Sequence, residues 1–132
     1  MLQDEVADRL VAQPGGSDYG VLSVMTQYAA DITKAFRVSA QCFRPRPDVA
    51  SAVVRLGMKE RTRLSPKEEV TLRALVKAAF AHRRKTLVNS LRDEGYALHS
   101  VTETLQRLDI ALARRAETLS VEEFLQLALA LG

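Results

Sequence analysis

The chain has 132 residues, of which 47% are hydrophobic and 27% are charged, and this composition is typical of a globular protein. The length suits one domain with its own core, or a small domain joined to a piece of another. No apolar run is long enough to cross a membrane, and acids at Asp4 and Glu5 interrupt any signal segment. We therefore expect a cytoplasmic protein with no membrane contact. The single Cys42 agrees with a reducing compartment.

The net charge of +3 is unevenly distributed along the chain. Residues 1–60 carry seven cations and seven acids, so the positive excess belongs to the second half. Within residues 73–92 there are six cations and no acid, namely Arg73, Lys77, Arg83, Arg84, Lys85 and Arg92. Such a run indicates either a polyanion-binding surface or a solvated helix face. Solvated faces usually interleave acids, and this run does not.

The first sixty residues predict a short α/β segment. Residues 1–3 suit the end of a strand, and apolar residues at helical spacing follow until QPGGSDYG breaks the chain. A second helical run, VLSVMTQYAA, precedes two strand-like stretches, KAFRVSA and SAVVRLG, which flank a proline-containing loop. About three strands are too few for a complete α/β domain, so we expect part of one.

The second half predicts a small all-α domain over residues 61–132, with the boundary in the polar stretch MKERTRLSP. Capping-box pairs predict three helix starts, at Ser65 with Glu68, Ser100 with Glu103, and Ser120 with Glu123. Apolar stripes at helical spacing follow each start.

The stretch FAHRRKTLVNSL, residues 80–91, is predicted to be helical. At about 100 degrees per residue, one side would carry His82, Lys85, Asn89 and Arg92, and a neighbouring side would carry apolar residues. Such a helix would bury one face and offer positive charge on the other, which suits contact with a phosphate backbone.

The longer stretch AFAHRRKTLVNSL resembles the helical signature of the ribosomal RNA adenine dimethyltransferases of the small-subunit, KsgA (RsmA) type. Four other stretches resemble the same family in the same order, and together they cover nearly the whole chain: MLQDEVADRLVAQPG, DYGVLSVMTQY, FRPRPDVASAVVRL and RAETLSVEEF. The resemblance implies a Rossmann-like methyltransferase domain that binds S-adenosylmethionine, then a helical RNA-binding domain. It also implies double methylation of an adenine exocyclic amine in small-subunit ribosomal RNA, a step in ribosome biogenesis.

The resemblance assigns a catalytic role to the loop that begins at Phe43. In the family's FxPxPxVxS motif, the aromatic ring stacks on the target adenine, and Phe43, Pro45 and Pro47 occupy the matching positions. An adenine inside a helix must leave its stack before its amine can react, so an aromatic platform suits the chemistry. The prolines would stiffen the loop. Asp48 departs from the family's usual lysine, and we expect Arg44 and Arg46 to supply the positive charge.

The family's cofactor site has no match in this sequence. We find no glycine-rich turn after a strand, no following ribose-binding acid and no Asn-Leu-Pro-Tyr type motif. The resemblance therefore implies a C-terminal portion: residues 1–60 from a methyltransferase domain and residues 61–132 from the helical domain. We expect this chain alone to bind no S-adenosylmethionine and to be inactive. We also expect self-association through an open sheet edge near residues 1–3.

The predicted RNA contacts are Arg83, Arg84, Lys85, Asn89 and Arg92, with Arg44, Arg46, Arg114 and Arg115 as further candidates. An ion pair with Glu117 is the alternative for the pair at 114 and 115. The two histidines and the cysteine have no metal-ligand spacing. We expect small-subunit ribosomal RNA, or a pre-ribosomal particle, and the missing N-terminal portion as partners.

The sequence also suggests alternative functions. A non-catalytic nucleic-acid-binding module of helix-turn-helix type would use the turn in GYALHS. A relative acting on large-subunit RNA, and a transcription factor of the same ancestry, are further alternatives.

Overall fold

The structure, a computed structural model, describes residues 2–39, 50–58 and 64–131. The chain divides into two compact units. Unit 1 comprises residues 1–13 and 18–62, and unit 2 comprises residues 14–17 and 63–132. Over the described ranges, unit 1 is a small α/β assembly and unit 2 is helical.

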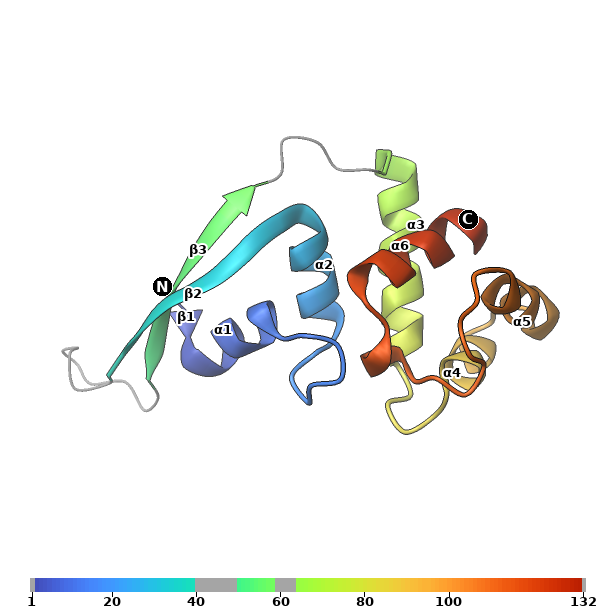
Figure 1. The fold of residues 1–132 in the computed structure, drawn as a ribbon, viewed down its shortest axis with the longest axis horizontal. Helices are drawn as coiled ribbons and strands as arrows, with labels where there is room; N and C mark the ends of the chain where they lie inside the picture. Colours follow the sequence, from blue (N-terminus) through green and yellow to red (C-terminus); the bar gives the residue numbers. More distant parts are fainter. Residues whose placement is uncertain (1, 40–49, 59–63, 132) are drawn as a thin grey trace. The chain divides into compact units, whose positions relative to one another are not determined.

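Unit 1 contains a three-stranded antiparallel sheet with two helices (Figure 1). Its elements are β1 (Leu2–Gln3), α1 (Asp4–Val11), α2 (Val21–Ala29), β2 (Ala30–Val38) and β3 (Ser51–Met58). In the described part of the chain the strand order is β1-β3-β2. The predicted helices and strands are present, although β2 begins four residues before the expected Lys34.

Helix α1 covers one face of the sheet and is anchored there by charge. Lys34 of β2 places its Nζ 2.5 Å from Asp4 Oδ1 and 2.9 Å from Asp8 Oδ1. The hydrogen bond to Asp4, then that to Asp8, raises the pKa of Lys34. Ala7 on α1 and Ala52 on β3 are fully buried. Together these contacts fix the helix over the strands.

The sheet leaves much of β3 uncovered. β1 pairs only with Ser51 and Ala52, whereas β3 continues to Met58. Leu56 and Met58, which lie opposite Ile32 and Ala30 of β2, are 52% and 71% exposed. Large apolar side chains on an open strand are available for contact with another chain or segment.

Unit 2 is a helical bundle around a closed core. Its elements are α3 (Pro66–Phe80), α4 (Leu87–Asp93), α5 (Leu98–Arg107), the 3-10 turn η2 (Ala116–Thr118) and α6 (Val121–Leu131). Figure 1 shows α3 and α6 crossing, with α4 and α5 beside them. Each helix contributes fully or almost fully buried side chains, including Leu72, Leu75, Val76, Leu87, Leu91, Val101, Leu105, Phe124 and Leu127.

Two of the three predicted helix starts are confirmed. Ser65 Oγ accepts from the Glu68 N–H at 3.2 Å, and the Glu68 carboxylate accepts from the Ser65 N–H at 3.0 Å. The pair of Ser120 and Glu123 makes the same reciprocal contacts at 3.1 and 3.0 Å.

The third predicted start, at Ser100, is wrong because α5 already begins at Leu98. The preceding helix α4 closes with a left-handed turn at Gly95, where φ is 99°, and the Tyr96 N–H donates to the Leu91 carbonyl at 3.0 Å. This compact ending lets the next helix begin soon afterwards, and Ser100 lies inside it.

Candidate RNA-binding surface

The basic stretch is not one continuous helix, so that prediction is wrong. Helix α3 ends at Phe80 and α4 begins at Leu87, and the three consecutive cations Arg83, Arg84 and Lys85 lie in the turn between them. The expected alignment of four polar residues on one helical face therefore does not exist. The positive charge is carried by a connection between two helices.

Two hydroxyl side chains explain why the helix breaks there. Thr86 caps α4, since its Oγ1 accepts from the Asn89 N–H at 3.3 Å. Ser90, which is fully buried, donates its hydroxyl to the Ala78 carbonyl at 2.7 Å and accepts from the His82 N–H at 3.3 Å. Ser90 thus satisfies backbone groups at the end of α3. Neither role was predicted from the sequence, although a threonine just before an apolar stretch is a recognisable cap signal.

Acidic side chains lie against several of the predicted RNA contacts. Lys85 is ion-paired with Asp93, and Arg92 Nε lies 3.4 Å from Asp93 Oδ1. The hydrogen bond from Lys85 is the main cause of the lowered pKa of Asp93. Although the sequence run itself lacks acids, the fold brings Asp93 against two of its cations.

Arg83 has a structural role in unit 2. Its Nη2 donates to the Ser17 carbonyl at 2.6 Å, and its Nε lies 3.9 Å from a Glu117 carboxylate oxygen. Gly15 in the same loop donates its N–H to the Glu117 carbonyl at 2.6 Å. These contacts attach the loop of residues 14–17 to the helical bundle.

Arg114 also has a structural partner, and it is Glu123 and not Glu117, the partner named in the alternative prediction. Its guanidinium donates to both carboxylate oxygens of Glu123, at 2.5 and 3.0 Å, and to the Thr118 carbonyl. Partial burial raises the pKa of Glu123, but hydrogen bonds from Arg114 and Ser120 outweigh it, and the net pKa is lowered. Arg114 therefore supports the start of α6.

Arg84 and Arg115 are exposed, and neither has an ion-pair partner among the residues that the structure describes. Asn89 is half-buried in the first turn of α4. The predicted loop residues Phe43, Arg44, Pro45, Arg46 and Pro47 lie outside the described residues. The described site thus retains two unpaired arginines and a group of cations shared with carboxylates.

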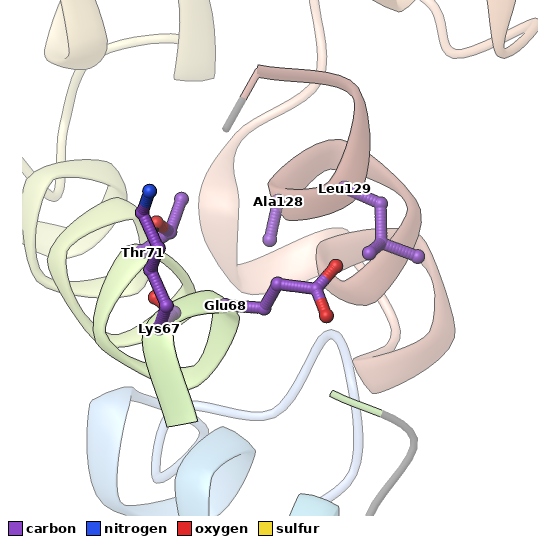
Figure 2. Close-up of a pocket in the computed structure, with 5 residues that line it drawn as sticks. All are labelled: Lys67, Glu68, Thr71, Ala128 and Leu129. Atoms are coloured by element: carbon purple, nitrogen blue, oxygen red, sulfur yellow. Dashed lines mark hydrogen bonds between the residues drawn. The ribbon is translucent and has the colours of Figure 1, made fainter. Parts of the chain in front are cut away.

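A small hollow of about 130 Å³ lies between α3 and α6. Figure 2 shows its lining, with Glu68 extending from α3 toward α6. Glu68 already accepts the Ser65 N–H, and none of the predicted RNA contacts borders the hollow. Within residues 2–39, 50–58 and 64–131, no helix has the length and apolarity needed to span a membrane, and no group of metal-ligating side chains forms.

Comparison with known proteins identifies the family. The model of the family described as "Ribosomal RNA adenine dimethylase" matches residues 1–131. The chain belongs to this family. Its resemblance to the small-subunit dimethyltransferases, first noted from short motifs, is confirmed over almost its full length.

Several curated relatives carry the name "Ribosomal RNA small subunit methyltransferase A". The relative from Chlamydia caviae is 46% identical over 127 residues, covering 96% of this chain and 45% of the relative. Those from Saccharophagus degradans and Desulfitobacterium hafniense are 48% and 49% identical, covering 97% and 94% of this chain and 46% and 45% of themselves. This family member therefore spans less than half the length of these relatives.

Solved structures agree with the fold. A dimethyladenosine transferase from Plasmodium falciparum has a TM-score of 0.78 and is 25% identical, covering 96% of this chain and 54% of its own. The 23S rRNA methyltransferase ErmE has a TM-score of 0.64 and is 23% identical, and the match covers 98% of this chain and 52% of the ErmE chain. This similarity supports the fold alone.

Proposed function

We propose that this chain is the RNA-engaging portion of an enzyme that dimethylates adenines in small-subunit ribosomal RNA. The observation that supports it most is the match of residues 1–131 to the ribosomal RNA adenine dimethylase family. The relatives named for small-subunit methylation, at 46–49% identity, favour that RNA over large-subunit RNA. In this proposal residues 1–60 derive from the methyltransferase domain and residues 61–132 from the helical domain.

The proposed RNA contacts differ in how free their charges are to bind phosphate. Arg84 and Arg115 are exposed and lack a described carboxylate partner, so they bind phosphate directly. Lys85 and Arg92 share Asp93, and exposed ion pairs of this kind contribute little, so phosphate competes for them readily. Three further residues both contact RNA and hold the surrounding surface in place, namely Arg83, Asn89 and Arg114. Arg44 and Arg46 add charge beside the target base.

Phe43 provides the stacking surface for the extruded adenine, with Pro45 and Pro47 stiffening its loop. Base-aromatic stacking contributes about 1 to 3 kcal/mol, enough to favour an unstacked base at the reaction centre. The assignment rests on the family motif.

S-adenosylmethionine binding requires polypeptide beyond this chain. The only consecutive glycines, Gly15 and Gly16, lie in a loop between two helices and not after a strand. The residues present therefore do not fit S-adenosylmethionine, and no catalytic step is assigned to this chain alone. Isothermal titration of this chain with S-adenosylmethionine is expected to show no specific heat of binding. A saturable one-to-one isotherm would overturn this part of the proposal.

We propose that the chain self-associates through the open sheet edge near residues 1–3 in the absence of that further polypeptide. Among the described strands β1 is an edge strand, and it pairs with only Ser51 and Ala52 of β3. Light scattering is expected to detect a dimer whose fraction rises with concentration. A monomer at all concentrations would contradict it.

The proposed RNA contact is tested by salt dependence. Small-subunit ribosomal RNA transcribed in vitro is titrated with the chain at several salt concentrations. Each phosphate contact changes the slope of log K against log salt by about 0.7 to 0.9. The variant with Arg83, Arg84 and Lys85 all replaced by Ala is expected to lose roughly two units of slope on the same basis. An unchanged slope would assign these cations to a solvated surface.

A further inference from the structure

The outward side of α3 carries two cations of the basic run that were not among the predicted RNA contacts. We call it the α3 outer face and define it by Val70, Arg73, Ala74 and Lys77. All four residues are exposed, and Val70 is 65% exposed. The opposite side of the helix is buried through Leu72, Leu75, Val76 and Ala79. The outer face is therefore held on a rigid, fully packed helix.

The two cations of this face differ from most of those in the neighbouring turn. Neither Arg73 nor Lys77 has an ion-pair partner within the described portions of the chain. By contrast, Lys85 and Arg92 share Asp93. Among the described residues, the two positive charges of the face therefore take part in no ion pair.

Helix electrostatics explain only one of these cations. Lys77 lies in the last turn of α3, where a positive charge interacts favourably with the helix dipole. Arg73 lies near the middle of the helix, beyond the reach of that effect. Glu69 precedes Arg73 by four residues, a spacing at which opposite charges stabilise a helix slightly. Val70 and Ala74 add neither an acid nor a hydrogen-bonding group. Because the gain from Glu69 is small and Arg73 is exposed, its guanidinium stays available for a binding role.

The geometry of the face suits an extended polyanion. Residues four apart on a helix have Cβ atoms about 5 to 6 Å apart, so Arg73 and Lys77 reach out side by side. Val70 and Ala74 have short side chains, which leave room for a ribose-phosphate strand to approach the helix between the two long cationic side chains. Unpaired cations that flank a low apolar strip provide charge complementarity to phosphates.

We propose that the α3 outer face is a second contact for the backbone of ribosomal RNA, with Arg73 and Lys77 each neutralising one phosphate. This inference rests on the proposed function and adds a surface on the long helix to the turn that follows it. The contact reads no base sequence, so it contributes affinity and orientation.

The test uses a double variant and a charge-matched control. Arg73→Gln with Lys77→Gln removes two charges and keeps good helix formers. Arg55→Gln with Arg107→Gln removes two charges from exposed positions on β3 and α5. Binding of each variant of this chain to in vitro transcribed small-subunit ribosomal RNA is measured from about 50 to 300 mM salt, where counterion release dominates.

We expect the double variant to lose about 1.4 to 1.8 units of the slope of log K against log salt, and about tenfold in affinity at the low-salt end. The control is expected to lose much less. Unchanged binding of the double variant, while the wild-type chain binds RNA, overturns the inference and leaves the proposed function standing. Equal losses in both variants would also overturn it, because they would reflect net charge alone. Wild-type chain that fails to bind would instead refute the proposed function.

Discussion

The two units differ in how they treat their large apolar side chains. In unit 2 every helix buries large apolar side chains in one core, where Phe124 is fully buried. A few others on these helices face outward, namely Val70, Leu98 and Leu129. Unit 1 leaves Phe36, Leu56 and Met58 on paired strands at 58%, 52% and 71% exposure. The helical unit has a core of its own, whereas the sheet retains surface for additional contacts. This difference agrees with a chain that spans less than half the length of its relatives.

The same substitution in both units tests this contrast most strongly. Phe124→Ala removes a ring that lies 5.8 Å from that of Phe80 in the bundle core. We expect it to lower the free energy of unfolding by about 3 to 5 kcal/mol. Phe36→Ala, on the open sheet, should cost less than about 1 kcal/mol. Urea denaturation followed by circular dichroism measures both, and equal losses would show that unit 1 is as closed as unit 2.

Two adjacent arginines sharpen the division between structural and RNA-binding charge. Arg114→Ala removes the contacts that hold Glu123, and we expect a loss of about 1 to 2 kcal/mol in stability, since both groups are only partly buried. Arg115→Ala should change stability by less than about 0.5 kcal/mol. Thermal unfolding separates the two. Similar melting temperatures for both variants would argue against the assigned role of Arg114.

The Arg114 contact also predicts a dependence on pH. The folded chain lowers the pKa of Glu123 from its ordinary 4.5, so the stabilisation is present above pH 4.5. It is lost as pH falls through the folded pKa. Unfolding free energies of wild type and Arg114→Ala should therefore differ at about pH 6 and converge as the pH falls below the folded pKa of Glu123. A constant difference across that range would contradict the assignment.

Two serines give the smallest expected effect within unit 2. Ser65→Ala removes the cap of α3 and should cost about 1 kcal/mol. Ser100→Ala lies inside α5 on an exposed position and should be neutral, or stabilising by up to about 0.5 kcal/mol. Chemical denaturation measures the unfolding free energy of both variants. It compares a serine that caps a helix with one that only matches the capping motif in sequence. A larger loss from Ser100→Ala would restore the predicted helix start.

Local signals in the sequence predicted much of the fold. Ser65 with Glu68 and Ser120 with Glu123 act within one turn, so their capping geometry follows from spacing alone. Ser100 had the same spacing, but the ending of α4 at Gly95 determines where α5 begins. A capping motif is thus reliable only where the preceding element leaves its start free.

The charge balance of the site could not be predicted because it depends on the turn between α3 and α4. Lys85 and Asp93 are eight residues apart, and Arg114 and Glu123 are nine apart. Neither pair has a spacing that one helix would bring together. The buried Ser90 creates the break in the helix, and its contact with Ala78 is tertiary. Sequence therefore located the positive charge but not its partners.

The central proposal is that this family member recognises structured ribosomal RNA in preference to duplex DNA. The direct test compares two dissociation constants of this chain, one for in vitro transcribed small-subunit ribosomal RNA and one for a mixed-sequence DNA duplex. Both are measured at one salt concentration and corrected for the number of binding sites that each nucleic acid offers. We predict a preference for RNA of at least about tenfold, equivalent to roughly 1.4 kcal/mol. Equal affinity, or tighter binding to DNA, would contradict the claim and favour a helix-turn-helix DNA-binding role for α4 and α5.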